Sequence, residues 1–180
     1  MPAGGIHPWQ IAGAQLTKPV VIAVQGTCLT LGIELMLASD IVVAADSASF
    51  AQIEVARGIL PFGGATIRFP RAVGWGNAMR WLLTGDTFDA AEALRIGLVQ
   101  EVVAHGEQYA RGLELAQRVS AQAPLAVQAA LANARIAIRD GDVAAEAALQ
   151  PELVRLVGSE DAAIGMEAFM SRSVPEFVGR

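Results

Sequence analysis

The sequence has few of the residues that build disulfides and metal sites. Cys28 is its single cysteine, which excludes an internal disulfide and any zinc site built on cysteines. The two histidines, His7 and His105, are too few for most metal clusters. We therefore expect no metal in the functional site.

Charged residues are also scarce, yet the longest apolar run still contains some of them. Charged residues make up 17% of the chain and hydrophobic residues 53%, with a net charge of -5, which argues against a general nucleic-acid binder. The longest apolar stretch, residues 28–45, contains Gly32, Glu34 and Asp40, whereas a membrane span needs about 20 residues with few or no charges. We expect a globular protein without nucleic-acid or membrane partners, whose extra apolar surface is buried between subunits.

The N-terminal stretch carries no targeting pattern. MPAGGIHPWQ is rich in glycine and proline and lacks a basic start followed by an apolar core, so the cytoplasm is the expected location. The hydrophobic residues of segment 1–17 follow neither the helical nor the strand period, so this segment is predicted to form a loop or arm.

The next part of the chain has the pattern of a parallel α/β core. Residues 19–26 and 40–46 are β-branched, continuous runs, typical of strands buried on both faces, and residues 31–39 between them read as a helix. This order predicts parallel pairing through a crossover. Residues 48–69 are interpreted as short extended pieces around a Pro/Gly turn.

Helices dominate the remainder. A helix over 89–97 has Asp89 as its N-cap, Glu92 three residues later and Gly97 as its stop. We divide the chain into an arm (1–17), an α/β core (18–105) and a helical region (106–180). The other predicted elements are helices over 75–85 and 107–121, from Pro124 to Gly141, from Asp142 to near Gly158 and after Ser159, and a strand over 98–104.

Two familiar kinds of site are excluded by their absent motifs. There is no G-x-S-x-G, and neither histidine lies in a promising context for a Ser/His/Asp triad. Gly63 and Gly64 match neither phosphate-binding glycine pattern, so they predict a turn before a helix.

Two glutamates in apolar surroundings remain as candidates. Glu34 lies in TLGIELMLASD and Glu54 in FAQIEVARG. If both point into one pocket, desolvation raises at least one pKa, and a neutral acid can face an ionised base. A purely structural alternative stays open: Glu34 complements a helix dipole, and Glu54 pairs with Arg57.

The backbone beside Glu34 suggests what such a pair would do. Gly26 follows a strand and Gly32 lies near a helix start, where unpaired N–H groups bind developing negative charge. A carboxylate one turn along suits proton transfer next to a carbonyl. The implied chemistry is enolate formation, without a metal or a covalent intermediate.

The combined motifs resemble a known family. KPVVIAVQGTCLTLGIELMLASDIVVAADSASFAQIEVARGILPFGGATIRFPRAVG, continued by LLTGDTFDAAEALRIGLVQEVV, is similar to the core of the crotonase (enoyl-CoA hydratase/isomerase) superfamily, over roughly residues 18 to 175. The resemblance implies an α/β fold, a partial spiral of ββα turns, with a C-terminal helical region that packs in trimers, often paired into hexamers.

The resemblance also implies roles for individual residues. Glu34 matches the base that directs water, Glu54 the acid that supplies the α-proton, and Leu31 the backbone N–H donor of the oxyanion hole. Coenzyme A enters as part of an acyl-CoA substrate, with no separate cofactor. The implied substrate-binding positions are Thr30, Gly32, Leu60, Phe62, Phe169 and Arg172.

The chain departs from the family pattern in four places. Thr30-Leu31-Gly32 replaces three glycines, and a left-handed backbone at Leu31 would cost about 1–2 kcal/mol. Ile53 replaces a proline, and Phe62 replaces a glycine, which with Leu31 narrows the acyl pocket. The family's long N-terminal region, with the second oxyanion donor, has no counterpart in the first 17 residues.

Three functions follow from these observations. We expect an enoyl-CoA hydratase, shortened at its N-terminus, that adds water across the 2,3 double bond. The alternatives are a non-catalytic assembly subunit, and another acyl-CoA enzyme of the family such as an isomerase, decarboxylase or thioesterase.

Overall fold

The chain folds into two compact units, which are described separately. The computed structural model describes residues 4–180. The first unit includes the arm up to Leu16 and the segment Val20–Leu115, and the second includes Thr17–Pro19 and Ala116–Arg180.

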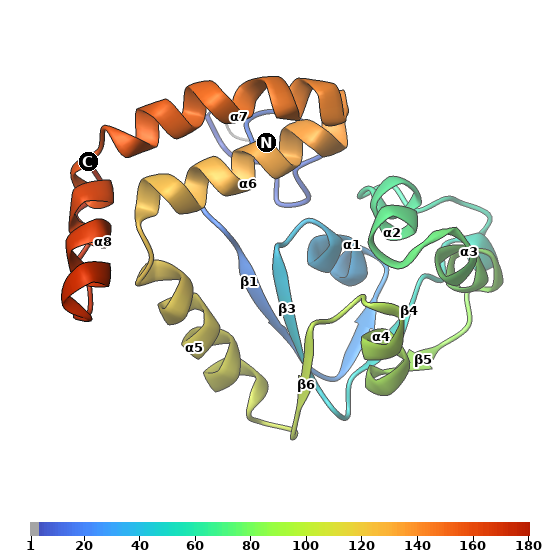
Figure 1. Ribbon diagram of the computed structural model, residues 1–180. Coiled ribbons are helices and arrows are strands. Elements are labelled where there is room, and N and C mark those ends of the chain that lie inside the picture. Colours follow the sequence, from blue (N-terminus) through green and yellow to red (C-terminus); the bar gives the residue numbers. More distant parts are fainter. Residues whose placement is uncertain (1–3) are drawn as a thin grey trace. The chain divides into compact units, whose positions relative to one another are not determined.

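A parallel sheet forms the centre of the first unit (Figure 1). It consists of β1 (Val21–Val24), β3 (Ile41–Ala45) and β6 (Glu101–Val103), in the order β1-β3-β6. Val21 is paired with Ile41, and Val43 with Glu101, both in parallel register. The predicted strands and their parallel pairing are confirmed.

A second small sheet contains two strands that the sequence did not reveal. It joins β2 (Thr27–Leu29) in parallel to β4 (Ser49–Ala51), which pairs antiparallel with β5 (Phe88–Asp89). Strands of three and two residues are too short for a period of two to be visible. Tertiary packing stabilises them instead, as in the stacked rings of Phe50 and Phe88, whose centroids lie 5.5 Å apart.

The helices of this unit follow the sequence pattern. The predicted turn before a helix at Gly63 and Gly64 is confirmed, because α2 begins at Ala65, so the extended pieces of this segment end before that residue. Ala65, Phe69 and Val73 are buried at a spacing of four residues, which is the helical period. The helical elements are α1 (Leu31–Leu37), η1 (Val55–Arg57), α2 (Ala65–Val73), α3 (Trp75–Thr84), α4 (Ala90–Ile96) and α5 (Gln108–Ser120), the last crossing the boundary between units.

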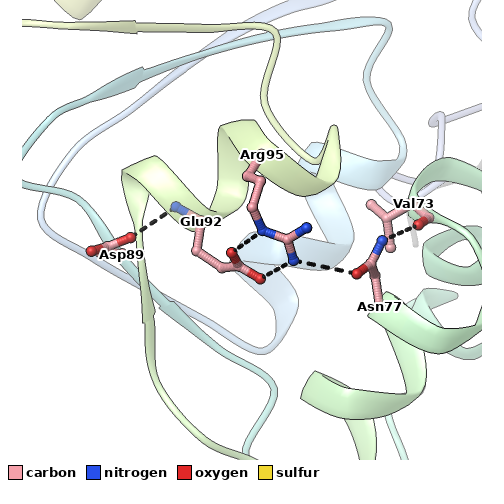
Figure 2. Close-up of polar contacts among 5 residues, drawn as sticks. All are labelled: Val73, Asn77, Asp89, Glu92 and Arg95. Carbon is pink, nitrogen blue, oxygen red and sulfur yellow. Dashed lines mark hydrogen bonds and ion pairs between the residues drawn. The ribbon is translucent and has the colours of Figure 1, made fainter.

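Polar contacts begin α4 and connect it to α3 (Figure 2). Asp89 accepts the N–H of Glu92 at 2.8 Å, which confirms the predicted N-cap. Glu92 accepts two hydrogen bonds from Arg95, whose Nη2 also donates to Asn77 Oδ1 at 3.4 Å. Asn77 in turn donates to the carbonyl of Val73 at 2.9 Å, so the cap of α4 also fixes the junction between α2 and α3.

The core of the first unit contains both large apolar side chains and polar ones. Ile33 and Met36 of α1 are buried in one apolar cluster with strand residues such as Val42 and Phe50. Glu34, between Ile33 and Met36 in the chain, is as completely buried as they are. The fully buried side chains are Phe50, Phe69, Ile33, Met36, Gln52, Glu34, Val43 and Val99.

The second unit is helical, as predicted. Its helices are α6 (Pro124–Asp140), α7 (Asp142–Val157) and α8 (Glu160–Ser171). α7 runs back alongside α6 after Gly141, and Asn133 of α6 donates to the carbonyl of Ala145 at 2.9 Å (Figure 1). None of the helices in the described part of the chain is long and apolar enough to span a bilayer.

A buried carboxylate holds the C-terminal segment in this unit. Asp161, in the first turn of α8, accepts the N–H groups of Val178 at 2.7 Å and Gly179 at 3.0 Å. The buried apolar side chains described here are small, namely Ala129, Ala145 and Ala168. Large ones are exposed instead: Ile138, Val143, Leu149, Leu153, Val154, Val157, Met166, Phe169, Met170, Val174 and Val178.

Candidate functional site

Glu34 is held by backbone from another part of the chain. Its Oε1 accepts the N–H of Gly63 at 2.8 Å and that of Ala65 at 3.0 Å. Both amides lie at the start of α2, where N–H groups lack partners within the helix and favour a negative charge. Glu34 therefore complements the dipole of α2 rather than that of α1, its own helix.

This arrangement needs a glycine at position 63. A Cβ atom added to Gly63 would lie 2.6 Å from Oε2 of Glu34 and 2.9 Å from its carboxyl carbon. The backbone approaches the carboxylate closely because no side chain intervenes. Oε2 itself is buried and has no hydrogen-bond partner.

Glu54 is buried without any hydrogen-bond partner for its carboxylate. Its residue is 3% exposed, and both Oε1 and Oε2 are unpaired. The ion pair with Arg57 does not form, because Arg57 Nη1 donates to the carbonyl of Ile53 at 3.3 Å. Unpaired buried carboxylate oxygens are costly, and a catalytic role is one reason for a protein to retain them.

Burial and the neighbouring charge shift the pKa of Glu54 upward. Desolvation is the largest cause, and the negative charge of Glu34 adds to it. The nearby backbone N–H of Glu54 itself and the charge of Arg57 act in the opposite direction without cancelling the rise in pKa. The electrostatic interaction between Glu34 and Glu54 indicates that the two carboxylates lie near each other in one poorly solvated region.

The positive φ of the left-handed backbone considered for Leu31 occurs at the preceding residue, Thr30. Leu31 is the first residue of α1, whereas Thr30 has φ 49° and ψ -113°. A β-branched residue at positive φ is a genuine outlier. The N–H of Thr30 donates to the carbonyl of Ala51 at 3.0 Å, so the twist at Thr30 orients the next peptide, which carries the N–H of Leu31.

The other predicted positions differ in their surroundings. A Cβ on Gly32 would lie 2.8 Å from Sγ of Cys28, so close packing accounts for this glycine. Leu60 and Phe62 are 65% and 62% exposed on the segment that leads to Gly63. Phe169 and Arg172 belong to the second unit, where Phe169 of α8 is 80% exposed and Arg172 ends the helix with φ 57°.

Sequence reasoning missed the residues that hold Glu34. Gly63 and Ala65 contribute through their backbone N–H groups, so their side chains carry no chemical signal. The available clue was a glycine pair directly before a helix, which is where an anion is bound. Gln52 was also missed: its amide is fully buried and unpaired two residues before Glu54.

The first unit also contains an open surface cavity away from these residues. It has a volume of about 600 Å³ and is lined by residues of β4, β5, α3 and α4, including Trp81 and Glu92. Neither Glu34 nor Glu54 lines it, so we do not assign the reaction to it. Within residues 4–180, no group of three or more His, Cys, Asp or Glu side chains is placed to hold a metal ion.

Comparison with known proteins identifies the family. The sequence model described as enoyl-CoA hydratase/isomerase matches residues 7–180. The chain belongs to the enoyl-CoA hydratase/isomerase family. The match confirms the resemblance seen in the sequence and extends its range beyond residues 18 to 175 into the arm.

Individual family members show the same relationship. The chain is 36% identical to enoyl-CoA hydratase EchA19 of Mycobacterium tuberculosis, over 94% of this chain and 64% of that protein. It is 36% identical to the 2,3-dehydroadipyl-CoA hydratase of Escherichia coli, over 91% of this chain and 64% of that one. The chain thus spans less than two thirds of these curated relatives.

A solved structure confirms the crotonase-like fold. The crystal structure of a probable enoyl-CoA hydratase/isomerase from Mycobacterium abscessus is 62% identical to the chain. It superposes with a TM-score of 0.98, over 99% of this chain and 69% of that one.

The strain at Thr30 predicts a stabilising substitution. Thr30→Gly removes a strain of about 1–3 kcal/mol and costs about 0.5–1 kcal/mol in chain entropy. We expect a net gain of about 1 kcal/mol in the free energy of unfolding, measured by urea denaturation. Thr27→Gly is the matched control, because Thr27 lies in β2 without a positive φ, and this substitution should lower the free energy of unfolding. If both variants lower the free energy of unfolding, the assignment of strain to Thr30 is contradicted.

The close approach at Gly63 predicts that even one methyl group is harmful. In Gly63→Ala the Glu34 carboxylate must move and lose its two donors, which costs about 1–3 kcal/mol in the free energy of unfolding. Gly76→Ala is the control, because Gly76 lies exposed in α3 with no atom within 4 Å of an added Cβ. In the control the free energy of unfolding should rise by up to about 1 kcal/mol. Equal stability of the two variants would refute the close contact between Gly63 and Glu34.

The raised pKa of Glu54 predicts how stability depends on pH. Between the pKa of the unfolded chain, about 4.3, and the higher folded pKa, the folded state binds more protons, so stability falls as pH rises. Glu54→Gln cannot ionise and therefore avoids this fall in stability. The variant should unfold at a higher temperature than the wild type at pH 8. At pH 4 the advantage should disappear, and a constant difference between the two pH values would show that Glu54 titrates normally.

Proposed function

We propose that the chain is the part of an enoyl-CoA hydratase that carries both acid–base glutamates. The observation that supports this most directly is the pair of buried carboxylates, Glu34 and Glu54, with three of their four oxygen atoms unpaired and mutual repulsion between them. Several relatives that the chain matches are named hydratases, and one of them acts on 2,3-dehydroadipyl-CoA by its name.

The two glutamates divide the work of adding water. Glu34, held through one oxygen by Gly63 and Ala65, keeps Oε2 available to take a proton from water as the water oxygen bonds to the β-carbon. Glu54, whose pKa is raised by desolvation, is held protonated more readily and delivers its proton to the α-carbon. The electron pair of the carbon–carbon double bond passes through the thioester enolate to the new C–H bond.

The N–H of Leu31 stabilises the enolate oxygen. As the first amide of α1 it has no acceptor within the helix, and the twist at Thr30 determines its direction. A donor of this kind is worth about 10²–10³ in rate.

The remaining roles concern the substrate and the assembly. Thr30, Gly32, Leu60 and Phe62 are assigned to the acyl-thioester end, and Phe169 and Arg172 to coenzyme A. The exposed apolar side chains of α7 and α8, against the small buried ones, favour a trimer or hexamer that covers them. The same feature supports the second candidate function, a non-catalytic assembly subunit, which would form the oligomer without binding the thioester.

The loss of crotonyl-CoA absorbance tests the reaction. Glu34→Gln and Glu54→Gln should each lower kcat by about 10²–10⁴, because each removes one proton transfer. Glu107→Gln, an exposed glutamate, is the control and should retain the wild-type rate. Unchanged rates in both site variants would refute the assignment, and a 3-enoyl-CoA converted without water uptake would favour an isomerase.

A wild-type chain that forms trimers by light scattering but shows no thioester binding by calorimetry favours the assembly subunit.

A further inference from the structure

The N-terminal arm reaches the first residue of α1. The indole Nε1 of Trp9 donates to the carbonyl of Leu31 at 2.8 Å. This bond fixes the peptide group between Leu31 and Gly32, directly after the one whose N–H we assign to the enolate. Three residues later the same helix carries Glu34. Trp9 is half-buried and 22 residues away in sequence, so the contact is tertiary.

The same arm residue is held by α2. Arg68 Nη1 donates to the carbonyl of Trp9, and its Nη2 donates to the carbonyl of Gln10 at 3.0 Å. The guanidinium fork of arginine suits two carbonyl oxygens at once. Arg68 also lies over Gly64, with Nη1 3.2 Å from the position of an added Cβ, and Gly64 separates the two residues whose amides hold Glu34.

Further contacts connect the arm to both α1 and α2. Gln10 Nε2 donates to the carbonyl of Ala38, at the other end of α1, at 2.8 Å. Its Oε1 accepts the N–H of Leu16 at 3.2 Å. Ile11 Cγ2 lies 3.3 Å from the Cβ position of Gly64. The segment Trp9–Ile11 thus contacts both ends of α1 and the start of α2, and we name it the arm clasp.

We propose that Trp9, held by Arg68, is a positioning residue that fixes α1 against the start of α2 and so sets the geometry of Glu34 and the Leu31 amide. The inference deepens the proposed hydratase function and rests on it. No atom of Trp9 or Arg68 needs to touch the substrate. The clasp acts because α1 carries Glu34 and α2 carries the amides that hold it, so a shift between the two helices changes both.

A positioning role makes a distinct kinetic prediction. Misalignment of a base or an oxyanion donor weakens interactions made in the transition state, so kcat falls while KM stays nearly constant. It also reduces polarisation of the thioester carbonyl, which is seen as a smaller red shift when a cinnamoyl thioester of coenzyme A binds. A merely structural role would lower the melting temperature without changing either quantity in the folded enzyme.

Trp9→Phe in the full chain is the primary test, because it keeps the ring and removes only the N–H donor. We expect kcat for crotonyl-CoA to fall about fivefold, the factor that corresponds to one neutral hydrogen bond, with KM within twofold and a smaller red shift. Trp75→Phe is the matched control, since Trp75 is 72% exposed on α3, and should leave all three unchanged. Arg68→Lys should act in the same direction, and the double variant should be no worse than the poorer single one if the two residues act as a unit.

Amide hydrogen exchange provides a readout that needs no turnover. In Trp9→Phe the N–H groups of Gly63 and Ala65 should exchange about fivefold faster, while that of Val43 in β3 should not change. A variant that matches Trp75→Phe in kcat, red shift and exchange overturns the inference, as does a uniform acceleration that includes Val43. A wild-type chain without turnover or thioester binding refutes the hydratase proposal instead, and the exchange rates then decide on the arm clasp alone.

Discussion

The structure of the site depends on one hydrogen-bonded carboxylate, that of Glu34, at the start of α2. Glu34 has no exposed surface, and hydrogen-bond donors that replace its water lower the cost of burying its carboxylate. The amides of Gly63 and Ala65 are such donors, and they cost no side-chain entropy because the helix has already fixed them. The backbone of α2 therefore determines where the acid of α1 points, and the two helices have to be considered together.

The two units use their apolar residues differently. The first unit buries phenylalanine, isoleucine and methionine around its parallel sheet and has enough apolar burial to retain the unpaired carboxylate of Glu54 inside. The second unit buries alanines and exposes residues such as Val143 and Met166. Burial of an alanine removes little apolar surface from water, so the hydrophobic contribution to the stability of this unit is small. The contrast explains why a composition that is 53% hydrophobic does not give a uniformly dense core.

The sequence predicted the elements whose signals are local. The parallel strands appear as β-branched runs, and α4 is delimited by Asp89 and Gly97 at its ends. β2 and β5 could not be predicted because they exist only through pairing with β4. The two glutamates were found because a charge in an apolar segment is conspicuous.

The partners of those glutamates were not found, for a related reason. Backbone N–H groups are the same in every residue, and their direction depends on the tertiary fold. The positive φ considered for Leu31 occurs at Thr30 instead, because Leu31 is already the first residue of α1. The contact between Trp9 and Leu31 joins residues whose side chains give no pairing signal in sequence.

The contact between Gly63 and Glu34 makes the side chains that fit at one position depend on the residue at the other. While residue 34 keeps a long acidic side chain in this rotamer, residue 63 has no room for any side chain. A descendant that shortened residue 34 would free position 63 to accumulate other amino acids. In chains that keep an acid at position 34 in this rotamer, residue 63 is therefore constrained to glycine.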